Sequence, residues 1–205
     1  ICFTSPVANA NFTWTVVATN GITGAQNGTG ACLNQILVNN LLTQGTAVYT
    51  VTASANNCSG SPVTATVSIN PNPTVTQVNN IVVCPGQAIP AINFTSTPAG
   101  AAFSWTNSNQ AIGIVGGGSG SIPTWQAPVN VSGGPYVGTL SVNGTLNGCS
   151  GPNMTFTVTV NPTPTLTVNP PSLSLCSGTN AVITCSSNVS NATMTWVQAS
   201  TNASG

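Results

Sequence analysis

The chain has 205 residues and contains no Lys, Arg, Asp, Glu or His, although about a quarter of an ordinary protein is charged. This composition excludes most catalysis, because general acid–base chemistry uses these side chains and Ser, Thr or Cys nucleophiles need a neighbouring base or cation. It also excludes carboxylate-bound calcium, binding to nucleic-acid phosphates and attraction to anionic membranes. We therefore expect a protein that is not an enzyme and that carries no cofactor or metal.

The remaining composition favours β-structure in an oxidising compartment. Thr and Val are abundant and 40% of the residues are hydrophobic, which is unlike the low hydrophobicity and high charge of disordered chains. No run of 18 apolar residues predicts a transmembrane helix, and the opening residues do not resemble a signal peptide. Seven cysteines without a CxxC pair argue against zinc. They favour disulfides and hence an extracellular, cell-surface location.

Three landmarks recur at a spacing of 91 residues, and such a fixed period indicates a tandem repeat. The landmarks are the tryptophans Trp14, Trp105 and Trp196, the triplets Cys58-Ser59-Gly60 and Cys149-Ser150-Gly151, and the segments Asn70-Pro71-Asn72-Pro73 and Asn161-Pro162-Thr163-Pro164. Pro fixes its own φ and restricts the residue before it, so each Asn-Pro segment should be short, extended and stiff.

These segments predict the domain boundaries. Residues 1–70 form a repeat that lacks its first strand, residues 71–161 form a complete repeat, and residues 162–205 form the N-terminal part of a third. The chain is thus expected to be a section of a longer array. Short alternating runs in the complete repeat predict strands near 74–79, 88–95, 101–106, 111–115, 123–128, 136–143 and 154–160. Seven such strands without helical periodicity predict an immunoglobulin-like β-sandwich.

The aromatic residues are interpreted first as core. Phe12 with Trp14, and Phe103 with Trp105, point to one face of a strand, and Met194 with Trp196 repeats this pattern. A Trp between two sheets is typical of such sandwiches. We therefore expect these residues, Trp196 included, in the core. Trp125 is expected to follow the same alternation, but Trp125 and Tyr136 are also the candidates for contact with a glycan.

The cysteines predict two disulfides within the chain. Cys84 and Cys149 are the two cysteines of the complete repeat and should pair, which in the chain-entropy model contributes about 4 kcal/mol. Cys2 and Cys32 remain together in the first repeat and are expected to form a second bridge. The partners of Cys58, Cys176 and Cys185 are expected outside this chain, which accounts for the odd number of cysteines.

Several longer runs carry a family resemblance. They are Trp105-Thr-Asn-Ser-Asn-Gln-Ala-Ile-Gly113, Gly-Ser-Gly120-Ser-Ile-Pro123, Gly148-Cys149-Ser-Gly-Pro152 and Thr155-Phe-Thr-Val-Thr-Val-Asn-Pro162-Thr-Pro164. Together they resemble the PKD-like (immunoglobulin-like) repeats of Bacteroidota surface proteins. The resemblance implies tandem sandwiches of about 91 residues that act as spacers or stalks in secreted adhesins and gliding-associated proteins, exported by the type IX secretion system. Such repeats normally carry some charge, so complete neutrality is a departure.

The leading functional hypothesis is a structural repeat of a long surface filament or adhesin stalk. Its partners would be the neighbouring repeats of the same chain and other copies of the chain in a fibre, because a protein without net charge tends to associate. The alternatives are a glycan-binding module that uses Trp125 and Tyr136, and an accessory module of a large secreted protein such as a hydrolase. No nucleic acid and no membrane insertion are expected.

Overall fold

The structure is a computed structural model that describes residues 1–197. Within these residues the chain is built from β-strands and one short 3-10 helix, η1 (Gln110–Ile112). No helix in this part of the chain is long and apolar enough to cross a membrane. The expected all-β, immunoglobulin-like fold class is therefore confirmed.

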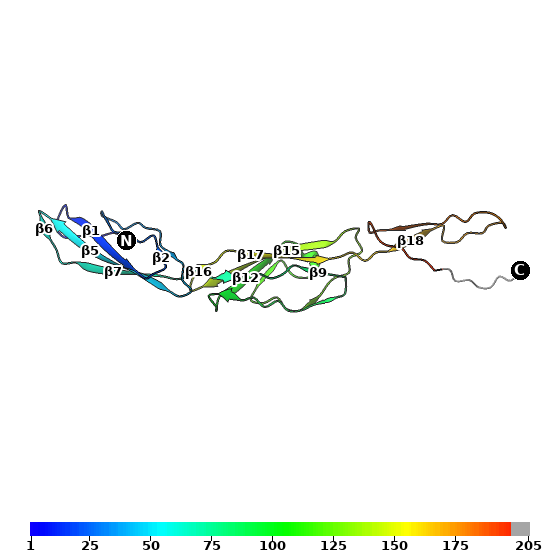
Figure 1. Cartoon of the computed structure of the whole chain (residues 1–205), viewed down its shortest axis with the longest axis horizontal. Coiled ribbons are helices and arrows are strands. Elements are labelled where there is room, and N and C mark those ends of the chain that lie inside the picture. The colour runs from blue at the N-terminus through cyan, green and yellow to red at the C-terminus, as the bar shows by residue number, and fades with distance from the viewer. Residues whose placement is uncertain (198–205) are drawn as a thin grey trace. The chain divides into compact units, whose positions relative to one another are not determined.

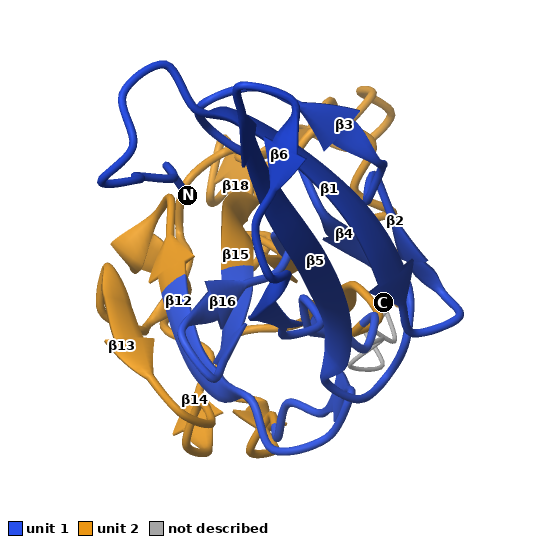
Figure 2. Ribbon diagram, turned by 90° about the vertical axis from the view of Figure 1, so that its left-hand side faces the viewer, with its two compact units in different colours: residues 1–77, 93–105, 142–154 blue, residues 78–92, 106–141, 155–205 orange. Residues whose placement is uncertain are grey.

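The chain divides into two compact units, coloured blue and orange in Figure 2. Unit 1 comprises residues 1–77, 93–105 and 142–154, and unit 2 comprises residues 78–92, 106–141 and 155 onward. The boundaries expected near residues 70 and 161 stay a prediction.

Strand β5 (Gly45–Ala55) is the centre of the first sheet in unit 1. It pairs antiparallel with β1 (Asn11–Ala18) on one side and with β7 (Val63–Ile69) on the other, as Figure 1 shows. Thr, Val and aromatic residues alternate along these strands, so that one face is apolar. The other strands that lie wholly within unit 1 are β2 (Ile22–Thr23), β3 (Gly28–Thr29), β4 (Val38–Asn39), β6 (Cys58–Ser59), β8 (Thr74–Val75), β11 (Ser96–Thr97) and β16 (Cys149–Ser150).

The second large sheet has the strand order β13-β12-β15-β17-β9, with β16 paired to β15. Its strands are β9 (Ile81–Val83), β12 (Ala102–Asn107), β13 (Gly117–Ser119), β15 (Tyr136–Leu146) and β17 (Met154–Val160). Strand β9 runs parallel to β17, whereas β10 (Ala88–Ile89) pairs antiparallel with β14 (Trp125–Gln126). The remaining pair, β18 (Leu166–Asn169) and β19 (Thr184–Ser187), forms a two-stranded sheet in unit 2.

The expected strand at 111–115 is wrong, because this segment begins as η1. The Asn109 side chain accepts a hydrogen bond from the Ala111 N–H at 3.0 Å and so caps the turn. Gly113 ends it in the left-handed region at φ 97°, a conformation that glycine adopts without steric cost. Local capping therefore overrides the alternating pattern of the sequence here.

The tryptophans differ in burial. Trp14 and Trp105 are buried, and Phe12 and Phe103 are half-buried beside them in the sequence. Trp196, which was expected in the core, is 86% exposed. Among the described residues from 162 onward the regular structure is the pair β18–β19, and two strands alone provide no second layer to cover a large ring.

Candidate functional site at the Asn-Pro segments

Three consecutive strands recur at equal lengths 91 residues later. Strands β5, β6 and β7 have 11, 2 and 7 residues, and so do β15, β16 and β17. The hairpin turns before β6 and β16 also match, because Asn56-Asn57 and Asn147-Gly148 all have positive φ, as a type I′ turn requires. Each Asn-Pro segment begins directly after the last of these strands, at Asn70 and Asn161.

The end of β7 is held by the side chain of Asn39. Its amide nitrogen donates to the Ile69 carbonyl at 2.7 Å and to the Thr43 carbonyl at 2.9 Å. Its amide oxygen accepts the N–H of Leu41 at 2.8 Å. A short polar side chain therefore closes its own turn, as Asn commonly does, and at the same time fixes the residue that precedes the first Asn-Pro segment.

Asn130 makes the same contacts 91 residues later. Its amide nitrogen donates to the Val160 and Gly134 carbonyls, both at 3.0 Å. Its amide oxygen accepts the Ser132 N–H at 3.0 Å and the Ser132 hydroxyl at 2.6 Å. Asn130 is fully buried, and both donors and the acceptor oxygen of its amide are used.

We name Asn39 and Asn130 the clamp asparagines. Residue-by-residue reading of the sequence missed them, because Asn is common in this chain and both positions resemble ordinary turn residues. A comparison at the 91-residue spacing would have found them, since Val38-Asn39 and Val129-Asn130 coincide in it.

The first Asn-Pro segment is also anchored by Asn70. The Gln44 amide nitrogen donates to the Asn70 amide oxygen at 2.7 Å. The Asn70 amide nitrogen donates to the carbonyl of Asn147, in the hairpin before β16, at 3.2 Å. Asn70 therefore links residues on both sides of the predicted boundary, all of them within unit 1.

In the segment that follows Asn70, every second side chain is buried. Pro71, Pro73 and Val75 are buried, whereas Asn72 and Thr74 are exposed. A β-carbon on Gly151 would collide with the Pro73 carbonyl oxygen. The close approach of the Pro73 backbone therefore explains why the triplet Cys149-Ser150-Gly151 ends in glycine.

The second Asn-Pro segment is held in unit 2 by Asn130 and Asn188. The Thr163 N–H donates to the Asn130 carbonyl at 2.7 Å. Asn188 accepts the Thr165 N–H at 2.7 Å and donates to the Val131 carbonyl at 3.2 Å. Both segments are therefore held by backbone and amide hydrogen bonds, and neither uses an ion pair, because the chain has no charged side chains.

No group of three or more metal-ligating side chains occurs among residues 1–197. The polar network of the first repeat instead links neutral groups. The Trp14 indole donates to the Gln26 carbonyl at 3.1 Å, Gln35 donates to the same carbonyl at 2.7 Å, and the Tyr49 hydroxyl donates to the Gln35 amide oxygen at 2.8 Å. Burial raises the pKa of the Tyr49 phenol above its ordinary value, because desolvation disfavours the phenolate. Trp105, the counterpart of Trp14, has a buried indole N–H without a partner.

The free energy of unfolding should change little between about pH 3 and about pH 8, because the carboxylates and histidines that drive acid unfolding are absent. Above about pH 10 it should fall. Since the pKa of Tyr49 is raised on folding, the unfolded chain releases this proton first, and alkaline pH favours unfolding. Thermal melts followed by circular dichroism across pH would measure this. Tyr49→Phe should remove part of the alkaline fall, and a cooperative acid transition near pH 4 would contradict the prediction.

One of the two disulfides predicted from the sequence is not formed. Cys84 and Cys149, expected to pair, are free thiols. Cys84 follows Val83, which pairs with Val160 at the end of β17, whereas Cys149 precedes the start of β17. A strand of seven residues spans about 23 Å, and a disulfide joins α-carbons about 6 Å apart. Cys58, Cys176 and Cys185 are also free within the described chain.

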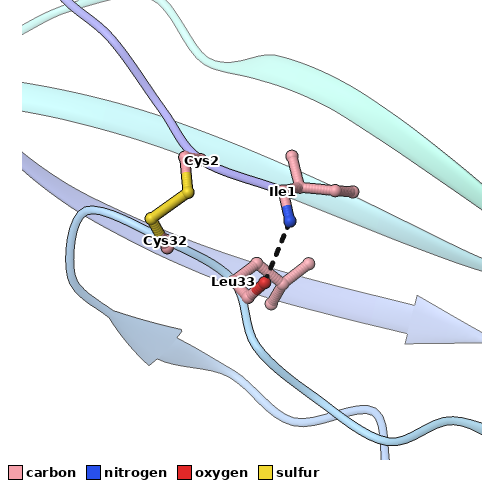
Figure 3. Close-up of a disulfide and its surroundings, with 4 residues drawn as sticks. All are labelled: Ile1, Cys2, Cys32 and Leu33. Atoms are coloured by element: carbon pink, nitrogen blue, oxygen red, sulfur yellow. Dashed lines mark hydrogen bonds between the residues drawn. A yellow bond between two sulfur atoms is a disulfide. The ribbon is translucent and has the colours of Figure 1, made fainter.

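Cys2 and Cys32 form a disulfide across an isolated antiparallel bridge, shown in Figure 3. The bridge is flanked by the Ile1 nitrogen, which donates to the Leu33 carbonyl at 3.1 Å. A second isolated bridge joins Ile92 to Ile122, and both of these residues are buried. The two bridges join residues with the same sequence separation. A disulfide stabilises the first bridge, and burial of two isoleucine side chains stabilises the second.

Trp125 and Tyr136, the candidates for glycan contact, are both half-buried. The Trp125 indole N–H donates to the Ile112 carbonyl at 3.1 Å. A β-carbon on Gly113 would lie 3.3 Å from the Trp125 ring, so the ring lies close to the end of η1. These contacts describe a packed, half-buried indole.

Trp125→Ala should lower the free energy of unfolding by about 2 kcal/mol, because a half-buried ring and its hydrogen bond are lost. Trp196→Ala is the matched control and should have an effect within about 0.5 kcal/mol, since Trp196 is 86% exposed. Denaturant titration followed by circular dichroism measures both. A Trp125→Ala protein of unchanged stability that loses binding on a glycan array would support the glycan interpretation instead.

Comparison with curated proteins finds no match to the chain. Comparison with family profiles matches residues 4–73 to the PKD-like domain. The matched residues contain β1 to β7 and end at Pro73, within the first Asn-Pro segment. PKD-like domains are usually extracellular structural or adhesive modules, and the disulfide at Cys2 agrees with such a compartment. Residues 4–73 are therefore similar to PKD-like domains, within a chain whose described part is all-β.

Proposed function

We propose that this chain is a non-catalytic structural section of a long extracellular surface filament or adhesin stalk. The observation that carries the proposal is the recurrence of one structural element at a spacing of 91 residues. In both copies three strands, each as long as its counterpart, are followed by an Asn-Pro segment. A clamp asparagine bonds the residue that directly precedes this segment.

This arrangement suits a chain that bears tension along its length. Each clamp asparagine bonds the last residue of a strand, Ile69 or Val160, to a turn elsewhere in the same unit. A pull on an Asn-Pro segment therefore acts on a strand end that side-chain hydrogen bonds secure in addition to the sheet. The proline-rich segment itself has little conformational freedom to lose on extension.

Neutrality supports contact between neighbouring fibres. Proteins without net charge lack the mutual repulsion that keeps ordinary proteins apart. Their contacts consist of hydrogen bonds and apolar burial, so they should respond little to salt, which at 1 M limits charge interactions to about 3 Å. A chain without Lys or Arg also gives trypsin-like proteases no cleavage site, as a durable external polymer requires.

Electron cryo-microscopy of the native cell surface tests the proposal. Strands of 11 residues with their turns predict one bead about every 35–45 Å along a filament. Filaments of this spacing that keep their form in 1 M salt are the expected result. A native surface with no such filament, where the chain is found as an accessory module of a secreted enzyme, would overturn the proposal.

A further inference from the structure

The sheet formed by β1, β5 and β7 in unit 1 packs on the core with one of its two faces. Trp14, Tyr49 and Val67 belong to the core cluster of this unit. Because side chains alternate between the two faces of a strand, their neighbours in sequence lie on the other face. That outer face carries six threonines, which we name the hydroxyl face: Thr13, Thr15, Thr50, Thr52, Thr64 and Thr66.

The strand register arranges these threonines in rows. Thr13 lies opposite Thr52, and Thr15 lies opposite Thr50. Thr50 in turn lies opposite Thr64. Neighbouring strands are about 4.8 Å apart, and residues two apart on a strand are separated by about 6.7 Å, so the hydroxyls form a two-dimensional array. The β-branched threonine side chain is stiff at χ1, which keeps this array ordered.

None of these six hydroxyls forms a hydrogen bond to another residue in the part of the chain that the structure describes. By contrast, the hydroxyls of Thr19 and Thr46, beside the hydroxyl face, lie 3.2 Å apart and bond to each other. Thr50 and Thr52 on the central strand are half-buried, and the other four threonines are exposed. The hydroxyl face therefore keeps its hydrogen-bonding capacity for water or for a partner.

The hydroxyl groups recur at the 91-residue spacing. Five of the six threonines have Ser or Thr as counterparts, namely Ser104, Thr106, Ser141, Thr155 and Thr157, and the counterpart of Thr52 is Asn143. None of these six residues is buried. In this copy the preceding strands pair elsewhere, β8 with β11, β9 with β17 and β10 with β14. The positions therefore stay accessible where all the adjoining strands are in place.

A face of neutral hydroxyls is complementary to itself. Each hydroxyl can both donate and accept a hydrogen bond, so two identical faces can satisfy each other, whereas two faces of like charge would repel. Charged side chains commonly keep the surfaces of β-proteins from associating. This chain has no Lys, Arg, Asp or Glu, so nothing on the hydroxyl face opposes contact with a second copy.

The same face is poorly suited to a sugar. The aromatic residues of β1, β5 and β7 are Phe12, Trp14 and Tyr49, which alternate with the threonines in sequence. They therefore lie on the core side of the strands. The hydroxyl face offers no aromatic ring on which a sugar could stack.

An apolar pair beside the threonine rows gives the face a driving force for contact. Val17 is 77% exposed and lies opposite Val48, which is half-buried and lies opposite Thr66. Exchanging bonds to water for bonds between hydroxyls changes the free energy little, whereas apolar surface gains by leaving water. We expect the valines to supply affinity and the hydroxyls to determine the register of the contact.

We propose that the hydroxyl face of one molecule packs against the hydroxyl face of a second copy of this chain. The two sheets would lie about 10 Å apart with their strands within about 30° of each other, as in aligned sheet packing. The contact uses the same surface on both partners and is therefore isologous. It rests on the proposed filament function, and it names the surface through which neighbouring fibres touch.

One such contact is weak by itself. Three strands that overlap over seven residues present an area of roughly 300 Å². A stable interface buries about 800 Å² on each partner. Association of this chain in solution should therefore need a high protein concentration, and in a long array each further repeat that presents the face adds to the avidity.

The test places one charge on the hydroxyl face of the full chain. Thr50 is on the central strand with its side chain away from the core, so that Thr50→Lys and Thr50→Glu should fold. Asn34→Lys and Asn34→Glu are the matched controls, because they add the same net charge at an exposed position outside the hydroxyl face. Far-UV circular dichroism checks that all four variants fold. Capping the free thiols with iodoacetamide prevents disulfide-linked oligomers.

Sedimentation equilibrium at up to about 1 mM protein should show reversible association of the wild type, equally at low salt and in 1 M salt. At low salt Thr50→Lys alone and Thr50→Glu alone should each associate roughly tenfold more weakly, because like charges face each other. An equimolar mixture of the two should recover the association, because opposite charges then meet. Salt at 1 M should remove this gain, since it screens charges beyond about 3 Å. Both Asn34 variants should associate as the wild type does.

Four results would overturn the inference. A wild type that stays monomeric up to about 1 mM would show that the face binds no second copy. Thr50 variants that associate like the wild type would place the contact elsewhere, and equal weakening by the Asn34 variants would attribute the effect to net charge. A mixture that gains nothing over its components would show that the face meets a different surface.

The filament function is tested separately by the cryo-microscopy of the native cell surface. Beaded filaments that run singly there would support that function and contradict the lateral contact. Filaments that lie side by side would support both.

Discussion

Asn130→Ala should lower the free energy of unfolding by about 3 kcal/mol. The substitution leaves the Val160 and Gly134 carbonyls and the Ser132 N–H without their partner in a fully buried site. Each buried polar group without a partner costs about 1–3 kcal/mol, and the small side chain adds a cavity. Denaturant titration followed by Trp fluorescence measures the change.

Two further variants make this prediction specific. Asn39→Ala should cost less than Asn130→Ala, because Asn39 is half-buried and water can replace part of its bonds. Asn40→Ala, at an exposed neighbour, should be neutral within about 0.5 kcal/mol. Hydrogen exchange of the Ser132 amide should accelerate in Asn130→Ala. Protection of that amide at the wild-type level would show that the clamp is dispensable.

Gly151→Ala should lower the free energy of unfolding by about 3 kcal/mol. The added β-carbon would collide with the Pro73 carbonyl oxygen and would lie 2.8 Å from the carbonyl carbon. The backbone of the Asn-Pro segment must then move, and overpacking of this kind typically costs 1–3 kcal/mol or more. Because the obstacle is backbone, a change of side-chain rotamer cannot relieve it.

Gly60→Ala is the matched control for this substitution. Gly60 holds the same place in its Cys-Ser-Gly triplet, but a β-carbon there would meet only the Ala53 carbonyl oxygen at 3.4 Å, an ordinary contact. The expected effect of Gly60→Ala on the free energy of unfolding is within about 0.5 kcal/mol. Equal destabilisation by both variants would mean that the triplet glycine serves its own hairpin and not the approach of Pro73.

Much of the architecture could be predicted from the sequence by itself. Alternation of Thr and Val with aromatic residues predicted β17 at its observed bounds and β15 to within three residues at its end. The absence of Lys, Arg, Asp, Glu and His excluded ion pairs between side chains before any fold was known. The spacing of Trp14 and Trp105 predicted two buried rings, because alternation determines which face of a strand is apolar.

Tertiary structure decided the features that depend on which strand ends meet. The Cys84–Cys149 pairing failed because sequence spacing does not show that β9 runs parallel to β17, which leaves the two sulfurs at opposite ends of a strand. The core role of Trp196 failed because burial needs a second layer, which β18 and β19 do not supply. The clamp asparagines and the Gly151 contact were likewise invisible, since an amide or a glycine has a structural role only once a distant backbone lies against it.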